Sequence, residues 1–225
     1  MQKICITTVG TSLLTNYSRY KANGGISNIR EYLFENPVKA SAETNSLQKL
    51  REDHELEAGN KIILLTTQTE KAQESAALLK EFAEKRLLQK VEINTLSAWN
   101  TEGKISAQAL SELTRKIVGI VEPFLTSVYT QKNVIINATG GYKALTSYAS
   151  IIGLMCGLNV YYIHEEHAAI MTLPPMPLAW DYSLIVDYDE FFAWLSTGIR
   201  TKSEVDEQLA EIKQKDAEEK YRTIV

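Results

Sequence analysis

The sequence predicts an α/β protein with a doubly wound, mostly parallel sheet of the Rossmann-like kind. Short apolar runs alternate with segments of helical periodicity from the N-terminus to about residue 165. This alternation favours a parallel sheet whose strands are joined by right-handed crossovers. Apolar residues make up 44% of the 225 residues, so the chain can bury a core of ordinary size.

Five strands are expected in this part of the chain. Each is a short run of β-branched or apolar residues that ends at a turn signal. The second run is almost wholly apolar, as in strands that are covered on both faces. The expected strands span residues 3–10, 61–67, 90–97, 133–139 and 159–165.

The clearest helix is expected over residues 68–86, where Ala72, Ala76, Leu79 and Ala83 form one apolar stripe. Residues 15–60 are the least regular region, and the stretch 16–25 is rich in turn residues. A long helix after residue 106 should bend or break near Pro123. The other expected helices span residues 27–36, 41–53, 106–129 and 141–157.

After residue 165 the alternation stops. Residues 168–183 contain three prolines and predict a hairpin or an extended arm, and a short helix is expected over 188–196. Thr201 with Glu204 resembles a capping box, which should begin a terminal helix with Val205, Leu209 and Ile212 on one stripe. We therefore expect one domain over 1–200 and a charged helix or linker over 201–225.

The charge and the cysteines indicate the class of protein. The net charge of −4 argues against a general DNA or RNA binder but leaves room for a local anion pocket. Cys5 and Cys156 lie in separate apolar segments, which is typical of buried, reduced thiols in a cytoplasmic protein. The N-terminus has no signal peptide pattern, and residues 144–163 predict a helix, a turn and a strand rather than a membrane span.

Hydroxyl groups and glycines gather where strands one, two and four end, in the segments TTVGTSLL, TTQTE and NATGGYK. Ligands of open parallel sheets bind at the carboxyl ends of the strands, near the point where the strand order reverses. If strands one and four are neighbours, their loops face each other across a crevice. Helix N-termini in that crevice would favour phosphate oxygens, and the glycines would let the backbone approach closely.

Lys143 is placed in the first turn of a helix. A cation there is disfavoured by the helix dipole by roughly a few tenths of a kcal/mol, and a bound anion would reverse that sign. A solvated surface lysine is the alternative interpretation. Ser12 also has two interpretations, as a residue that binds a ligand or as the N-cap of the helix that follows strand one.

Standard nucleotide and metal motifs do not fit. TVGTSL lacks the G-x-G-x-x-G pattern, and GGYKA lacks the spacing of a Walker A loop. His54, His164 and His167 do not form a metal set, and Trp99 and Trp180 are expected in a core or an interface, as is Trp194. No cofactor and no metal are therefore expected.

Three segments together are similar to the CRISPR-associated Rossmann-fold (CARF) family. They are TTVGTSLL, NATGGYKA and VYYIHEEHAAIMTLPPMPL, and their order and spacing resemble the ring nuclease branch of that family in particular. The segment KASAETNSL resembles the helical insertion of that branch, which would lie at about residues 15–60 and could act as a lid. The resemblance covers roughly residues 3–185.

The resemblance implies a homodimer whose two crevices hold one cyclic oligoadenylate, the second messenger of type III CRISPR systems. Ring nucleases cleave this ligand without a metal, to linear products with 2′,3′-cyclic phosphate ends. The family's serine falls on Ser12 and its lysine on Lys143, which are the expected catalytic residues. A 2′-hydroxyl attacks the adjacent phosphorus, so the site has to align the groups and stabilise phosphoryl charge.

The remaining expected site residues would bind the ligand, with Thr66 and Gln68 placed to meet an adenine edge. The alternative function is a sensor that binds the ring without cleaving it, or cleaves it slowly, and acts through an effector domain or subunit reached by the charged tail. The sequence leaves open whether the ring has four or six adenylates, with four preferred. The expected ligand-binding residues are Gly10, Thr11, Leu13, Thr66, Gln68, Asn137, Thr139, Gly140, Gly141 and Tyr142.

Overall fold

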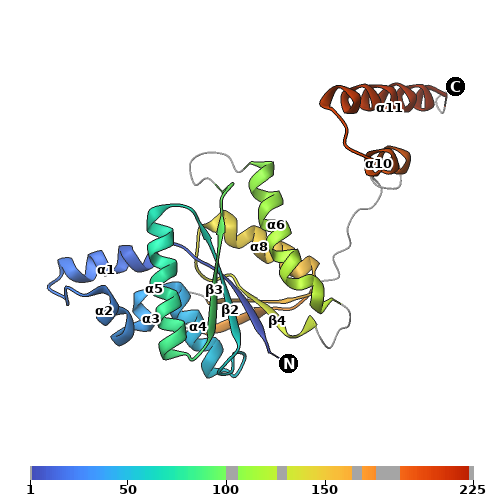
Figure 1. Cartoon of the computed structure of the whole chain (residues 1–225). Coiled ribbons are helices and arrows are strands. Elements are labelled where there is room, and N and C mark those ends of the chain that lie inside the picture. Colours follow the sequence, from blue (N-terminus) through green and yellow to red (C-terminus); the bar gives the residue numbers. More distant parts are fainter. Residues whose placement is uncertain (1, 100–105, 126–130, 164–168, 176–187, 223–225) are drawn as a thin grey trace. The chain divides into compact units, whose positions relative to one another are not determined.

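A computed structural model describes residues 2–99, 106–125, 131–163, 169–175 and 188–222 of the chain (Figure 1). The backbone forms two compact units, Met1–Leu178 and Ala179–Val225. Neither unit contains, among the described residues, a helix that is long and apolar enough to cross a membrane. The expected division at residue 200 stays a prediction.

The first unit is built on a six-stranded sheet with the order β3-β2-β1-β4-β5-β6. Strands β1 to β5 are parallel, and β6 pairs antiparallel with β5. The order reverses between β1 and β4, which confirms the doubly wound α/β fold predicted from the sequence. The strands are β1 Ile4–Thr8, β2 Lys61–Thr67, β3 Lys90–Leu96, β4 Val134–Asn137, β5 Asn159–Ile163 and β6 Ile170–Leu173.

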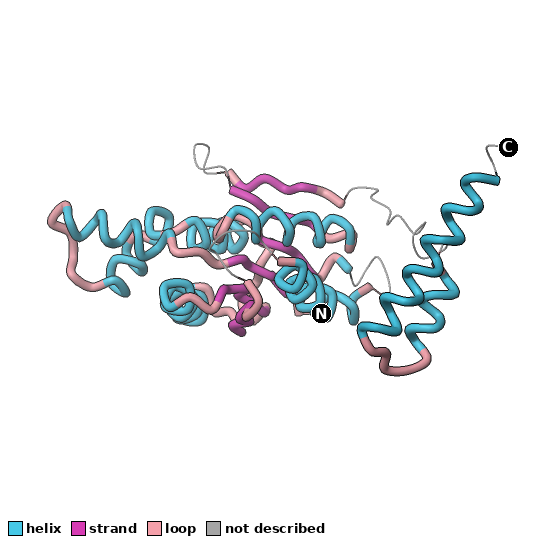
Figure 2. The backbone as a smooth tube through the Cα atoms, turned by 90° about the horizontal axis from the view of Figure 1, so that it is seen from above, coloured by secondary structure: helices cyan, strands magenta, loops and turns pink. Residues whose placement is uncertain are grey.

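Helices cover both faces of this sheet (Figure 2). One core cluster packs α1, α2, α4 and α5 on one face, and the other packs α6 and α8 on the opposite face. The described helices of this unit are α1 Ser12–Ala22, α2 Ile29–Glu35, α3 Pro37–Ala40, α4 Ala42–Glu52, α5 Glu70–Arg86, α6 Ala107–Val121, the 3₁₀ helix η1 Glu122–Phe124 and α8 Lys143–Met155.

Several expectations about the core are confirmed. Ile62 and Leu64 of β2 pack in one cluster while Ile63 and Leu65 pack in the other, so the apolar run is covered on both faces. The predicted apolar stripe of α5 is buried along its length. The long helix after residue 106 stops being α-helical at Val121, two residues before Pro123, and residues 126–129 of the expected helix lie outside the described residues.

The turn-rich interpretation of residues 16–25 is wrong for most of the stretch, because α1 continues to Ala22. Tertiary packing overrides the weak local propensity here. The ring of Tyr20 stacks on Tyr32 with centroids 4.5 Å apart, and Tyr17 lies 5.7 Å from the same ring. Contacts with α2 thus stabilise a helix whose sequence alone resembles a loop.

At the C-terminal end of the sheet-bearing unit, β6 pairs antiparallel with β5. The hairpin or extended arm that was expected within residues 168–183 stays a prediction. Residues 176–187 of that segment, including Pro177 and Trp180, lie outside the described residues, as do His164 and His167. Cys5 is buried, and burial raises the pKa of its thiol to about 12, whereas Cys156 is half-buried rather than fully enclosed.

The second unit contains α10 Asp189–Ser196 and α11 Lys202–Arg222. The capping box is confirmed, because the Thr201 N–H donates to the Glu204 carboxylate at 2.7 Å and the Glu204 N–H donates back to the Thr201 hydroxyl at 3.4 Å. Arg200 lies over the ring of Trp194, 4.6 Å from its centroid.

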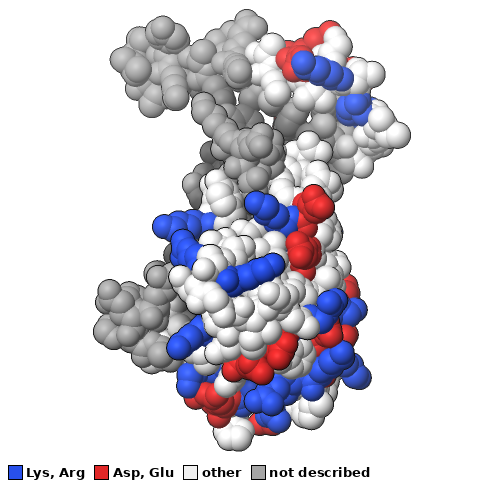
Figure 3. Space-filling view, turned by 90° about the vertical axis from the view of Figure 1, so that its left-hand side faces the viewer, with Lys and Arg blue, Asp and Glu red and all other residues white. Residues whose placement is uncertain are grey.

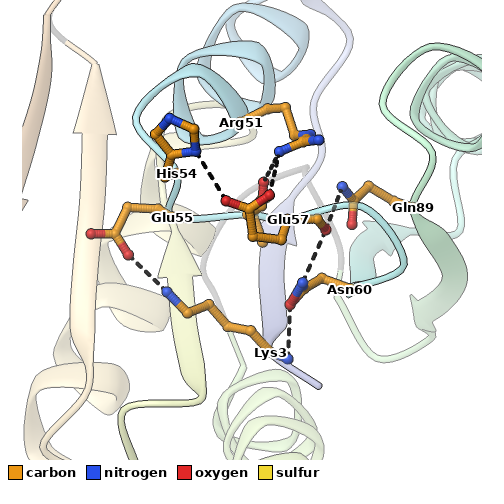
Figure 4. A network of polar contacts seen from close by, with 8 residues as sticks. Lys3, Arg51, His54, Glu55, Glu57, Asn60 and Gln89 are labelled. Atoms are coloured by element: carbon orange, nitrogen blue, oxygen red, sulfur yellow. Dashed lines mark hydrogen bonds and ion pairs between the residues drawn. The ribbon is translucent and has the colours of Figure 1, made fainter. Parts of the chain in front are cut away.

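A polar network fixes the amino ends of β1 and β2 (Figure 4). The Glu57 carboxylate pairs with His54 at 3.0 Å and with Arg51 at 2.8 Å, and hydrogen bonds from these two groups lower the pKa of Glu57. The Asn60 side chain accepts from the Lys3 N–H at 2.8 Å and donates to the Glu57 carbonyl. This network lies at the amino ends of the strands, opposite the carboxyl ends where the crevice is expected. It therefore stabilises the fold and does not contribute to the crevice.

Glu112 on α6 provides a stability test. Its carboxylate accepts the N–H groups of Ser97 at 3.0 Å and Ala98 at 2.7 Å, and so fixes the end of β3 to the helix. Desolvation raises the pKa of Glu112, but the hydrogen bonds from Ala98 and Ser97 outweigh it, so the pKa of this carboxyl lies below its usual value. The ionised form therefore stabilises the fold above the unfolded-state pKa, and this contribution is lost as the pH falls through the folded-state value.

We expect Glu112→Gln to lower the free energy of unfolding by about 1–2 kcal/mol at neutral pH. Urea unfolding at pH 7 and at a pH below the folded-state pKa of Glu112 measures this difference, which should shrink at the lower pH because the wild-type carboxyl is then protonated. Glu74→Gln, at an exposed position of α5, is the control and should change little. An equal loss at both pH values would contradict the assignment.

Candidate functional site

The reversal point of the sheet brings the loops after β1 and β4 together. Thr7 lies opposite Asn137 in the paired strands. A Cβ built on Gly10 would come within 2.8 Å of the Cα of Gly141, and Gly141 has a φ of +117°, where side chains are strained. The Thr8 hydroxyl also donates to the carbonyl of Gly140. The prediction that these two loops face each other is confirmed.

A cavity of about 1030 Å³ opens at this point. The first residues of three helices line it, Ser12 of α1, Glu70 of α5 and Lys143 of α8. Helix N-termini favour anions because of their N–H groups and dipoles. The complete lining is Val9, Gly10, Thr11, Ser12, Thr15, Asn16, Thr67, Thr69, Glu70, Lys71, Ala72, Gly141, Tyr142 and Lys143.

Two lysines line this cavity. Lys143 is exposed in the first turn of α8, as the sequence predicted, and Lys71 occupies the corresponding turn of α5. Within the described part of the chain neither ammonium belongs to an ion pair of 4.0 Å or less. Both charges are therefore available to a ligand. Sequence analysis missed Lys71, although its position just after the TTQTE strand end was a signal.

Ser12 is not the N-cap of α1, so that interpretation is wrong. Thr11 holds the N-cap position, and its side chain makes no capping hydrogen bond. Ser12 is the first helical residue, and its hydroxyl donates to the Oε2 of Glu43 at 3.0 Å. The hydroxyl is therefore engaged by a distant residue and not by the helix that it begins.

Glu43 is a site residue that sequence analysis did not single out. Its side chain is 1% exposed, and its Oε1 accepts the N–H of Gly10 at 2.7 Å while Oε2 accepts from Ser12. Glu43 lies in the first turn of α4, which is capped by the Ser41 side chain. The contact joins segments 31 residues apart, so no local pattern could have revealed it, although Glu43 lies within the KASAETNSL segment.

A second cavity of about 380 Å³ adjoins the same serine. Arg19 and Lys39 line it together with Thr139 and Tyr162, and Ser12 contributes to both cavities. Helices α1, α3 and α4 and the end of β5 thus form a recess that contains two basic side chains. Figure 3 shows one face of the molecule, on which basic and acidic side chains are interspersed.

The structure brings only part of the expected ligand-binding set to the larger cavity. Gly10, Thr11, Gly141 and Tyr142 line it, and Thr139 lines the second cavity. Leu13 is 1% exposed and packs in the core. Gly140 is buried against Glu43, where a Cβ would overlap the carboxyl group.

Two of the remaining predicted residues are displaced by strand alternation. Thr66 is fully buried and Gln68 donates to the Ser97 carbonyl at 2.9 Å, and neither lines either of the two cavities. Side chains alternate between faces along a strand, so Thr67 rather than Thr66 lines the larger cavity. Thr69, which lies after the strand at the N-cap of α5, also lines it.

Asn137 makes hydrogen bonds within the protein and does not line either of the two cavities beside Ser12. It is fully buried, donates to the Ser46 hydroxyl of α4 at 2.8 Å and accepts from the Thr139 hydroxyl at 2.8 Å. Asn137 thus joins β4 to α4, and it holds Thr139 in place beside the second cavity. Among the described residues, no three His, Cys, Asp or Glu side chains are grouped so that they could hold a metal ion.

Comparison with known proteins assigns the family. Curated proteins give no match. One matching solved structure, Can2 from Sulfobacillus thermosulfidooxidans in complex with cyclic tetra-adenylate, has a TM-score of 0.43 and 12% sequence identity over 94% of this chain. This chain spans 57% of that one.

A family model described as CRISPR-associated protein (Cas_APE2256) matches residues 38–176. The matched region contains Glu43 and Lys143 and runs from α3 to just beyond β6. It agrees with the resemblance of the strand-end motifs to CRISPR-associated proteins of the CARF type. Since the match covers more than half of the sequence, the chain belongs to this family of CRISPR-associated proteins.

Proposed function

We propose that the chain binds cyclic oligoadenylate, with cyclic tetra-adenylate preferred, and cleaves it without a metal to linear products with 2′,3′-cyclic phosphate ends. The observation that carries this proposal is the cavity at the β1–β4 reversal, where Ser12 and Lys143 stand at the first positions of two helices. Cleavage would switch off type III CRISPR signalling, a role that suits the CRISPR-associated family of the chain.

The cavity suits a ligand that carries several phosphates. Three helix N-termini and the ammonium groups of Lys71 and Lys143 surround it, and each favours anionic oxygens. The close approach of Gly10 and Gly141 keeps the wall free of side chains there. Hydroxyl groups of Thr11, Thr67 and Thr69 supply hydrogen bonds to ribose or phosphate.

Cleavage requires no metal in this scheme. The 2′-oxygen of one ribose attacks the adjacent phosphorus in line with the 5′-oxygen, which departs as the cyclic phosphate forms. Lys143 stabilises the charge that grows on the phosphoryl oxygens and protonates the departing oxygen. Ser12 aligns the attacking ribose. Alignment of this kind is worth several kcal/mol when the ring is held in a bent, near-attack shape.

We propose that the site is completed in a homodimer. The outer face of α8 exposes Tyr148 and Ile151 at 37% and 48%, and Tyr142, which lines the cavity, is 41% exposed. Exposed apolar groups beside a ligand site are typical of an interaction surface. A second copy docked on α8 would bring two cavities together around one ring.

The second candidate function is a sensor that holds the ring intact or cleaves it slowly. The unit Ala179–Val225 favours this function, because its charged helix α11 offers a connection to an effector domain or subunit. The two functions share the cavity and differ only in the fate of the ligand.

The first test incubates the purified chain with cyclic tetra-adenylate or cyclic hexa-adenylate in excess EDTA. We expect the four-membered ring to give linear di-adenylate with a cyclic phosphate end, detected by mass spectrometry. Tight binding with the ring intact after long incubation would contradict cleavage and favour the sensor.

The second test is Lys143→Ala. We expect kcat to fall by about 100-fold or more, because a preorganised charge at the phosphoryl group is lost. The melting temperature should stay level or rise slightly, since the change removes a cation from a helix N-terminus. Lys116→Ala on α6 is the control, and normal turnover by Lys143→Ala would exclude this lysine from the mechanism.

The third test concerns the dimer. Light scattering should show a dimer at micromolar concentration, and Ile151→Glu should yield monomers because it buries a charge in the interface. The matched control is Leu88→Glu, which alters an apolar side chain that is 62% exposed away from α8. A wild-type monomer would contradict the shared site.

A further inference from the structure

The carboxylate of Glu43 accepts two hydrogen bonds from the loop after β1 and the start of α1. Its Oε1 accepts the N–H of Gly10 at 2.7 Å, and its Oε2 accepts the hydroxyl of Ser12 at 3.0 Å. Gly140 closes the space behind the carboxyl group, since any Cβ there would overlap it. The absence of a side chain at Gly140 thus makes room for Glu43, and the carboxyl group is fixed between the two ligand loops.

The burial of the Glu43 carboxylate needs compensating interactions. The Glu43 side chain is 1% exposed, and within the described residues it has no basic side chain within 4.0 Å. Burial of an unpaired carboxylate disfavours the fold unless hydrogen bonds compensate. Two such bonds and the N-terminal dipole of α1 supply the compensation. A carboxylate thus already accepts the N–H of Gly10.

The bond to Glu43 also decides what Ser12 can offer a ligand. A serine hydroxyl has one proton and two lone pairs. Because the proton is directed at Glu43, the lone pairs remain for the cavity. Lone pairs accept from a ribose hydroxyl, whereas phosphate oxygens need a donor. Ser12 therefore suits a ribose hydroxyl, and Lys143 suits the phosphate.

We infer that Glu43 is a positioning residue, which orients Ser12 toward the attacking 2′-hydroxyl and receives its proton through Ser12. This inference rests on the proposed cleavage of cyclic oligoadenylate. The 2′-hydroxyl gives its proton to the Ser12 oxygen as Ser12 gives its own to Glu43. The new bond joins the 2′-oxygen to phosphorus, the bond from phosphorus to the 5′-oxygen breaks, and that oxygen takes a proton from Lys143. Proton exchange with water then removes the proton from Glu43 and returns one to Lys143.

The kinetic test compares Glu43→Gln with the wild type on cyclic tetra-adenylate in EDTA. Glutamine keeps the shape but cannot take the proton, so we expect kcat to fall about 100-fold with KM changed by less than about threefold. The double variant Ser12→Ala/Glu43→Gln should be no slower than Ser12→Ala alone, because both changes break one relay. Glu43→Asp should recover part of the lost rate.

The control for a purely structural effect is Glu112→Gln, the same chemical change at a carboxylate that accepts two N–H groups at the end of β3. Glu112 lines neither of the two cavities beside Ser12, so this variant leaves Glu43 and Ser12 in place. Its kcat should stay near the wild-type value at an equal loss of melting temperature. If the wild type cleaves the ring and Glu43→Gln has the same kcat, the proton relay through Ser12 to Glu43 is overturned, and the proposed cleavage function stands.

A binding test covers the cases in which Glu43→Gln fails to fold or the wild type does not cleave. The all-2′-deoxy cyclic tetra-adenylate ring should bind the wild type about tenfold more weakly than the natural ring, since Ser12 loses its donor. In Ser12→Ala, which leaves the bond from Gly10 to Glu43 intact, this discrimination should vanish. Equal affinity of the wild type for both rings would overturn the assignment of a ribose hydroxyl to Ser12.

Discussion

The close contact between Gly10 and Gly141 is the constraint on which the rest of the site depends. Strands β1 and β4 lie side by side in parallel, and their loops leave the sheet in contact because neither carries a side chain there. The sheet order reverses at the same place, so helices α1 and α8 depart toward opposite faces. Two helix N-termini are thereby directed at one cavity, and a third from α5 joins them.

The insertion between β1 and β2 completes this arrangement from a distance. Helix α4 brings Glu43 to the loop after β1 and Ser46 to Asn137 of β4. The ligand loops are thus joined through α4 as well as through the sheet. A movement of α4 would change the hydrogen bonds of Ser12 and Thr139 together, which gives the insertion a more direct role at the site than that of a covering lid.

Sequence patterns predicted what depends on local periodicity. The apolar run of β2 and the stripe of α5 are examples, as are the break near Pro123 and the capping box at Thr201. The failures come from long-range contacts. Packing of Tyr17 and Tyr20 on Tyr32 makes α1 a helix, and Glu43 reaches Ser12 across 31 residues. Thr66 and Gln68 were predicted to meet the ligand, but they line neither of the two cavities beside Ser12. The direction of a side chain at the end of a strand depends on how the strand pairs in the sheet, and a single sequence does not show this pairing.

In the proposed complex a ribose 2′ position lies at Ser12 and the adjacent phosphate lies at Lys143, within one cavity. A crystal structure of the chain with an uncleavable 2′-deoxy cyclic tetra-adenylate ring tests it most directly. We expect a phosphate group at the Nζ of Lys143 and the 2′-carbon of the preceding ribose beside the Oγ of Ser12, with Glu43 still bound to Gly10. A ring bound elsewhere, or a phosphate on the Gly10 N–H with Glu43 displaced, would contradict it.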